Sequence, residues 1–468
     1  MNAKARSLSP VGALLDAVAA ALGPERVLTA PEQLACYSGF QWLPPRRHPL
    51  LRVPLGQPAG VVRPRNAEDV ALVLRRATAA GVLVVPFGAA SGVMGAALTL
   101  ADSIALDLGA LNRIWSIEPQ NQLARVEAGV VLGDLAQAAQ TQGLLFAHDP
   151  WSQPIATVGG AIGTNGVGYL AAGYGAMGQQ IRGVEAVLPT GERVDWPGAA
   201  KTSTGPELWR LFTGAEGTLG VVTSAVVQLY PWPEARSLTA CRFPTFADGF
   251  RAIRAFADIG LRPAMVDYEE EDESRLPLTG PAELHLAFDG PAEVVRAATR
   301  RASQVCREHG GRNQGQAAAE EFWAERHASI EWFLRREANR VADPPERDDH
   351  PREEMRYVDV AVPTARVLDY CAQVVEIARS NGAAVHSFGI WARSELVSYI
   401  LEGESAPAGH AEGPLDRTLD QALLLARREG GSIEYCHGVG LRLAHLLPSE
   451  LGSAYDLLRR VKSTLDPA

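Results

Sequence analysis

Several features that mark other protein classes are missing from this sequence of 468 residues. Its five cysteines are scattered and form no C-x-x-C pair, which predicts reduced thiols and a cytoplasmic protein. No apolar run approaches the roughly 18–20 residues of a membrane-spanning helix. Basic residues are outnumbered, with 44 Lys and Arg against 54 Asp and Glu. We therefore expect neither general nucleic-acid binding nor attraction to anionic membranes.

We do not expect a secretion signal at the start of this sequence. The apolar stretch at 11–22, VGALLDAVAAAL, is interrupted by Asp16, and no clear cleavage site of small residues follows it. We predict an amphipathic helix that ends at Gly23-Pro24.

The pattern of predicted elements changes at the proline-rich sequence PWPEAR, which follows Tyr230. Before it, short apolar runs predict strands at 82–85, 104–108, 123–128, 184–188 and 220–230, with helices at 67–80 and 131–142. After it, longer helices are predicted at 245–259, 292–309, 320–339, 364–381 and 414–429, with strands at 283–288, 357–362 and 384–388. The pattern predicts an α+β protein, and the charged segment 342–354 is expected to be a surface loop.

What the sequence does have is glycine, at 45 residues, and much of it is gathered in clusters. The first cluster is PFGAASGVMG (86–95), which follows a predicted strand. Small residues there let backbone N–H groups surround an anion, which favours a pyrophosphate site. A nicotinamide-binding turn with Asp107 on the ribose is an alternative, although the spacing G-x-x-x-G-x-x-G does not fit it well. A tight turn without a ligand is the third interpretation.

The second cluster is TVGGAIGTNGVGYLAAGYG (157–175). In regular structure so many glycines would cost about 0.5–1 kcal/mol each, so a compensating interaction is expected. A flat cofactor against bare backbone would supply it, with Thr157, Thr164 and Asn165 giving directional hydrogen bonds. The alternative is a glycine-rich loop packed on itself.

Two further clusters follow. GAEGTLGVVT (214–223) opens a predicted strand, whose backbone edge would suit a polar heterocycle. GGSIEYCHGVG (430–440) places His437 on a turn before the last helix.

In this order, the clusters resemble the FAD-binding flavoproteins of the vanillyl-alcohol oxidase and para-cresol methylhydroxylase superfamily. Members usually show P-x-G-G-G-T-S-x-x-G, then T-I-G-G-x-I-A-T-N-A-G-G with a Y-G pair, then E-V-V-L-P-D-G, which is EAVLPTG (185–191) here. They continue with G-S-E-G-T-L-G-I-I-T and, near the C-terminus, G-G-x-x-x-x-x-H-G-x-G. The chain is most similar to the branch of glycolate oxidase subunits, D-lactate dehydrogenases and alkyl-dihydroxyacetonephosphate synthases.

The resemblance implies an N-terminal helical segment (1–54), a two-part FAD-binding domain (55–235), an α+β substrate or cap domain (236–429) and a C-terminal segment (430–468) that returns to the flavin. It also assigns the first cluster to the pyrophosphate of FAD rather than to a nicotinamide cofactor. By the match of motifs, the residues expected to bind FAD are Pro86, Gly88, Ala89, Ala90, Ser91, Gly92, Gly95, Pro150, Ser152, Thr157, Gly159, Gly160, Thr164, Asn165, Gly168, Tyr174, Gly175, Glu216, Gly217, Gly220, Val221 and Val222.

The chain departs from its relatives in three places. The first loop lacks the histidine that links flavin covalently in some members, which predicts non-covalent FAD. Where relatives hold a divalent metal, this chain keeps only His386 and, at the second site, Cys436 in place of an acid, so we expect no metal. Asp267 stands where the synthases place an arginine. This makes a strongly anionic substrate less expected unless a residue such as Arg393 supplies the cation, and Trp391 would suit an aromatic substrate.

The resemblance implies a flavin oxidoreductase that takes a hydride from an alcohol or 2-hydroxy acid and passes electrons to oxygen, a quinone or a carrier protein. The hydroxyl proton needs a base, and His437 is the first candidate, with Tyr435 orienting the substrate and His386 as a second candidate. Two alternatives remain: a non-redox flavoenzyme like the ether-lipid synthases, and an FAD-binding subunit of a larger dehydrogenase. A homodimer is also considered.

Overall fold

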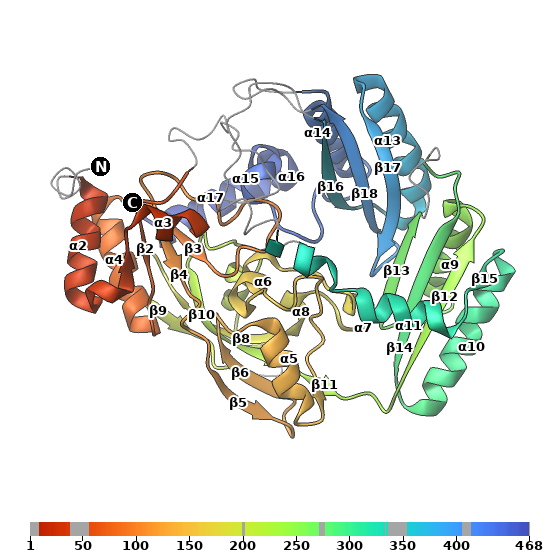
Figure 1. Ribbon diagram of the computed structural model, residues 1–468, viewed down its shortest axis with the longest axis horizontal. Helices are drawn as coiled ribbons and strands as arrows, with labels where there is room; N and C mark the ends of the chain where they lie inside the picture. Colours follow the sequence, from red (N-terminus) through yellow and green to blue (C-terminus); the bar gives the residue numbers. More distant parts are fainter. Residues whose placement is uncertain are drawn as a thin grey trace.

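The computed structural model describes residues 9–37, 56–198, 202–270, 277–332, 334–335, 353–404 and 413–467. Most of the expected surface loop at 342–354 lies outside these residues. The chain forms two sheet-based lobes, with helices α15–α17 running back from the second lobe to the first (Figure 1). The α+β class predicted from the sequence is confirmed.

A four-stranded sheet begins the first lobe, in the order β1-β2-β4-β3. Strands β2, β4 and β3 are parallel, while β1 is antiparallel to β2. The bounds are β1 Val27–Leu28, β2 Gly60–Val62, β3 Val84–Phe87, β4 Ile104–Asp107, and the helices packed beside them α2 Pro10–Leu22, α3 Pro31–Leu34 and α4 Ala67–Ala80. Helix α4 has the predicted bounds because Asn66 caps its start, accepting a hydrogen bond from the Asp69 amide at 2.8 Å, and Gly81 ends it with φ +62°.

An antiparallel five-stranded sheet completes the first lobe, in the order β5-β6-β10-β8-β9. The bounds are β5 Ile114–Glu118, β6 Leu123–Glu127, β8 Ile181–Val187, β9 Arg193–Asp195, β10 Val221–Gln228, and the helices α5 Leu132–Gln140, α6 Val158–Thr164, α7 Ala171–Tyr174 and α8 Met177–Gln180. A short ribbon pairs β7 Leu144–Leu145 with β11 Tyr230–Pro231.

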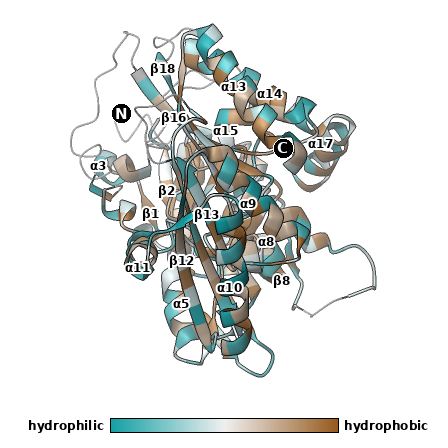
Figure 2. Ribbon diagram, turned by 90° about the vertical axis from the view of Figure 1, so that its right-hand side faces the viewer, coloured by the Kyte–Doolittle hydropathy of each residue, from teal (hydrophilic) through white to brown (hydrophobic). Residues whose placement is uncertain are grey.

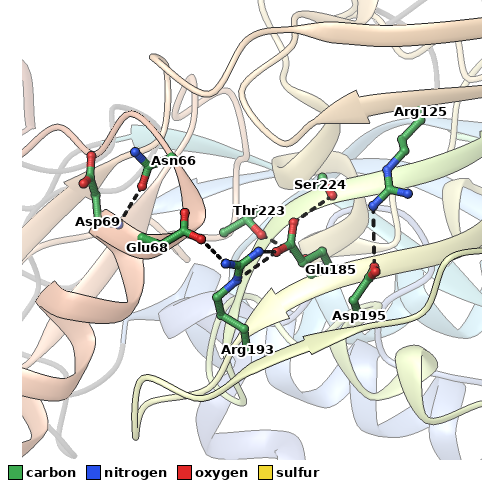
Figure 3. A network of polar contacts seen from close by, with 9 residues as sticks. All are labelled: Asn66, Glu68, Asp69, Arg125, Glu185, Arg193, Asp195, Thr223 and Ser224. Carbon is green, nitrogen blue, oxygen red and sulfur yellow. Dashed lines mark hydrogen bonds and ion pairs between the residues drawn. The ribbon is translucent and has the colours of Figure 1, made fainter.

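Charged side chains join helix α4 to the five-stranded sheet of this lobe (Figure 3). Arg193 on β9 bonds the buried carboxylate of Glu185 at 2.6 Å and also pairs with Glu68 at the start of α4. The Ser224 hydroxyl donates to the same Glu185 carboxylate at 3.2 Å. Because Glu185 has several partners, its burial is compensated and the helix is fixed against the second sheet.

The second lobe is one antiparallel sheet of seven strands, in the order β15-β12-β14-β13-β17-β18-β16. Its strands are β12 Ala235–Phe243, β13 Met265–Glu270, β14 Ala282–Gly290, β15 Arg312–Asn313, β16 Glu353–Ala361, β17 Ala384–Trp391 and β18 Leu396–Glu404. Its helices are α9 Phe246–Asp258, α10 Ala292–Glu308, α11 Gln316–Glu325, α13 Val367–Asn381 and α14 Pro414–Arg428.

The two faces of this sheet have different coverings. Helices α9, α10, α13 and α14 cover one face and share its largest hydrophobic core, and the outward side of α10 is largely hydrophilic (Figure 2). The other face meets strand β7 and the residue before α7 in the first lobe, where Met265 and Ala287 pack with Leu145 and Leu170. The seven-stranded sheet of the second lobe therefore packs directly against the first lobe.

One helix differs from its prediction. The helix expected at 320–339 begins earlier and is interrupted at 326–328, because Arg326 and His327 turn inward to the carboxylate of Asp149, each at 2.9 Å. Tertiary ion pairs here override the helical pattern.

The end of the chain returns to the first lobe through α15 Gly440–Leu443, α16 Leu447–Leu451 and α17 Ser453–Leu465. Leu458, Val461 and Leu465 of α17 pack against the core of the five-stranded sheet, and Lys462 Nζ donates to the Thr218 carbonyl at 2.8 Å. All five cysteines are free thiols. Among the described residues, no helix has the length and apolar composition needed to span a bilayer.

Candidate active site

The four glycine-rich clusters meet at one cavity of about 1350 Å³, part of it open to solvent. The predicted FAD-binding residues that line it are Pro86, Gly88, Ala89, Ala90, Ser91, Gly92, Pro150, Ser152, Thr157, Gly159, Gly160, Thr164, Glu216, Gly217, Gly220, Val221 and Val222.

The glycines allow the cavity loops to approach one another. Gly217 has φ +77°, and a Cβ there would lie 2.7 Å from the Pro86 ring of the first cluster. A Cβ on Gly159 would lie 2.8 Å from Ala128. Where the glycine clusters meet, the wall is therefore backbone and small side chains, with amide groups available to a pyrophosphate and apolar surface to a flat ring. These residues fit FAD.

The remaining predicted FAD-binding residues lie outside the cavity lining, and several have evident packing roles. Asn165 ends α6 with φ +52° and accepts a hydrogen bond from the Gly178 amide at 2.9 Å. Gly168 is pressed on the backbone of Asp149, which a Cβ would approach to 2.7 Å. The Tyr174 hydroxyl donates to Asp289 in the cap at 3.2 Å. The other two are Gly95 and Gly175, both at positive φ.

Glu216 fastens the C-terminal segment to the cavity. Its carboxylate accepts a hydrogen bond from the Gly440 amide at 2.9 Å, and a Cβ on Gly438 would lie 2.3 Å from the same carboxylate. Burial raises the pKa of Glu216 to about 7, against the opposing effect of its backbone hydrogen bonds. Gly440 also touches the first cluster, because a Cβ there would lie 1.9 Å from the Met94 carbonyl oxygen.

His437 lies in the cavity wall on this fastened turn. Its Nδ1 is 3.2 Å from the buried carboxylate of Asp359 on β16, and its backbone amide donates to Glu434 at 2.7 Å. Glu434 also accepts from the amides of Tyr435 and Cys436, so one carboxylate fixes the whole turn. Burial raises the pKa of Glu434 to about 7.

The protonation of His437 reflects opposing effects. Burial would lower its pKa, but the neighbouring Cys436 sulfur and the Asp359 carboxylate raise it, and the pKa of His437 lies well above its ordinary value. With Nδ1 directed to Asp359, Nε2 is the ring nitrogen that faces away from this carboxylate.

The other two predicted catalytic residues do not line the cavity. Tyr435 packs in a small cluster with Cys436 and Trp391 beside it. His386 lies at the opposite end of β17 from Trp391, and its Nε2 is 2.6 Å from Glu402 on β18. The geometry does not favour a catalytic role for His386, which we do not propose further.

Of the predicted substrate residues, only Trp391 lines the cavity. Its ring meets Tyr169 edge-on at 5.5 Å, and its indole bonds to the side chain of Asp267 on β13. Burial raises the pKa of Asp267 to about 8. Arg393 is exposed, two residues after Trp391 and past Ala392 at φ +64°.

Comparison with known proteins identifies the family. A model described as FAD binding domain matches residues 58–196, and the C-terminal domain model of FAD linked oxidases matches residues 232–468. The chain belongs to the FAD-linked oxidase family. This confirms the resemblance drawn from the glycine-rich loops.

Named relatives of this FAD-linked oxidase are distant. D-lactate dehydrogenase of Anaerostipes hadrus is 28% identical over 433 residues, with 88% of each chain covered. Glycolate oxidase subunit GlcD of Bacillus subtilis is 27% identical over 428 residues, covering 88% of this chain and 87% of that one. The crystal structure of p-cresol methylhydroxylase aligns with a TM-score of 0.74 at 18% identity, covering 98% and 95% of the two chains, which shows a shared fold.

Sequence reasoning missed three residues of this FAD-linked oxidase site. Asp359 is an acid inside the apolar strand YVDV, and Glu434 lies three residues before His437. His148 lies in the cavity wall before Asp149. Within the described ranges, no group of three or more His, Cys, Asp or Glu side chains is placed to hold a metal ion, and the absence of a metal stays a prediction.

Proposed function

We propose that this FAD-linked oxidase removes a hydride from the carbinol carbon of an alcohol or 2-hydroxy acid, with His437 as the base that takes the hydroxyl proton. The observation that carries this proposal is the His437 ring in the cavity wall, held at Nδ1 by Asp359 at 3.2 Å. Bound FAD supplies the hydride acceptor at N5.

Asp359 and Glu434 prepare His437 for this task. Asp359 fixes the ring so that Nε2 is directed away from the carboxylate, and Glu434 fixes the backbone of the turn. Because the Asp359 carboxylate also stabilises the imidazolium, it favours the proton on His437 after transfer. Glu216 keeps the turn against the FAD-binding lobe through Gly440.

The substrate class is open between two chemistries. The distant D-lactate dehydrogenase and GlcD relatives support a 2-hydroxy acid. Among the described residues that line the cavity, however, none is Lys or Arg, and Trp391 offers an aromatic surface. This favours a substrate whose binding does not need a fixed cation.

We further propose that FAD is bound without a covalent link and that electrons leave to oxygen, a quinone or a carrier protein. The protein is expected to work in the cytoplasm, in which free thiols persist. We also propose that the chain forms a homodimer, which a molar mass measured by light scattering would test.

The experiment is an anaerobic screen of the FAD-loaded protein. Hydroxy acids and phenolic alcohols are mixed with it, and the visible flavin absorbance is followed. Bleaching by one compound supports hydride transfer. A spectral adduct without reduction would instead indicate chemistry like that of the ether-lipid synthases, and no change with any compound would favour a non-catalytic FAD-binding subunit.

A further inference from the structure

His148 lies in the segment LFAHDP between β7 and α6 and is used by no part of the proposed reaction. The residue is 1% exposed and lines the cavity. Its Nδ1 is buried and has no hydrogen-bond partner among the described residues. A buried polar atom left unpaired costs about 1–3 kcal/mol, so such an atom needs an explanation.

The adjacent carboxylate does not provide the missing partner. Asp149 bonds Arg326 through Oδ2 and pairs with His327 through Oδ1, each at 2.9 Å. Burial lowers the pKa of His148 to about 4, so the ring is neutral near pH 7 and carries one N–H donor.

The position of His148 identifies which part of a cofactor it meets. A Cβ on Gly166 would touch the His148 ring at 3.5 Å, and the next residue, Val167, belongs to the cluster with Cys436 and Trp391. His148 therefore lies near the end of the cavity that carries Trp391, Cys436 and His437.

We propose that His148 positions FAD by donating a hydrogen bond from its imidazole to the polar edge of the isoalloxazine ring. The inference rests on the FAD binding of the proposed function but not on its substrate. A neutral donor stabilises the electron-rich reduced ring more than the oxidised ring, so His148 also raises the flavin reduction potential.

The chain offers a matched control in His285. Its Nδ1 is likewise buried without a partner, and burial likewise lowers its pKa to about 4. It stacks on Phe322 with ring centroids 3.9 Å apart and does not line the cavity. The same substitution at the two sites therefore separates loss of a buried histidine from loss of a cofactor contact.

The test measures FAD binding and potential without any substrate. Apoprotein carrying His148→Leu is titrated with FAD by fluorescence quenching, and the midpoint potential of each loaded variant is measured. We expect His148→Leu to weaken FAD binding by about 3–10-fold, as for one lost hydrogen bond, and to make the potential more negative. His148→Gln, which keeps a donor, is expected to recover part of both effects, and His285→Leu to leave both unchanged.

Three outcomes would overturn the proposal. One is an unchanged affinity and potential in His148→Leu. Another is an equal change in His285→Leu, and the third is flavin that stays with acid-precipitated wild-type protein but not with His148→Leu, because the ring would then form a covalent bond. A failed substrate screen changes none of these readouts, so the two proposals fail separately. If His148→Leu does not fold, His148→Phe, which keeps a ring but has no donor, carries the same comparison.

Discussion

The two walls of the cavity are built in different ways. The wall from the FAD-binding lobe is mainly backbone and small side chains where its glycine clusters meet, brought close by glycines such as Gly159 and Gly217, and His148 is a larger side chain in it. The wall from the cap and C-terminal segment carries Trp391, Cys436 and His437, with Asp359 directly behind. The first wall is suited to hold a cofactor by shape, and the second to act on protons. Substitutions in the two walls should therefore fail in different ways.

The largest effect is expected at His437. His437→Ala removes the proposed base, and flavin reduction by the substrate should fall by about 10²–10⁴-fold, while FAD affinity changes little. Stopped-flow reduction and FAD titration measure the two quantities. His445→Ala is the control, because His445 also pairs with a carboxylate, Asp420 at 2.9 Å, but lies outside the cavity lining. Wild-type reduction rates in His437→Ala would contradict the assignment.

The next largest effect is expected where Gly440 of the C-terminal segment contacts the Met94 backbone of the first glycine cluster. Gly440 has φ +51°, and the Cβ added in Gly440→Ala would lie 1.9 Å from the Met94 carbonyl oxygen. Left-handed strain and overpacking together predict a loss of about 2–5 kcal/mol in the free energy of unfolding, with His437 displaced. Urea unfolding tests this.

Gly81→Ala gives the matched control for that loss. Gly81 has φ +62° and ψ +33°, but a Cβ there would have no neighbour within 4 Å. It should lose only the strain, about 1–2 kcal/mol. Equal losses in the two variants would show that the Met94 contact is unimportant.

The same contrast explains what the sequence could predict. The cavity wall from the FAD-binding lobe is built from local features, namely glycines at positive φ and short loops after strands. Motifs of about ten residues are therefore enough to identify it. The acid behind His437 comes from β16, about 80 residues earlier than the turn, by a strand pairing that no local pattern encodes. Asn165 and Gly168 belong to the motif yet serve packing, since a motif preserves the fold of a loop as well as its ligand contacts.

The fold shows a similar division. Helices with capping residues, such as α4 behind Asn66, were predicted at their observed bounds. Strands β12, β13 and β18 were not predicted, because their sequences mix charged residues with apolar ones and only the assembled sheet pairs them. The helix near Arg326 was interrupted by ion pairs to Asp149, which is about 180 residues away in the chain.

A smaller effect is expected from Asp359→Asn. Because the base must be neutral, reduction should rise with pH through the pKa of His437, which lies well above its ordinary value. Removing the Asp359 carboxylate lowers that pKa, so the acid limb of the pH–rate profile should move to lower pH, and the maximal rate should fall by less than in His437→Ala. An unmoved limb would mean that Asp359 does not act on His437.

The smallest effect is expected at Glu216, and it concerns stability. Its pKa is raised from 4.5 to about 7 in the folded protein, so the folded state binds its proton more tightly than the unfolded state does. The stabilisation from this proton is complete below pH 4.5 and is lost as pH rises through about 7.

Glu216→Gln keeps an acceptor for the Gly440 amide but has no proton to lose, so the unfolding free energy of the variant should fall less between pH 5 and pH 8 than that of the wild type. Equal slopes in the wild type and Glu216→Gln would mean that the Glu216 carboxylate is ionised in the folded protein at pH 5, and that a charged group rather than a neutral acid fastens the catalytic turn to the cofactor wall.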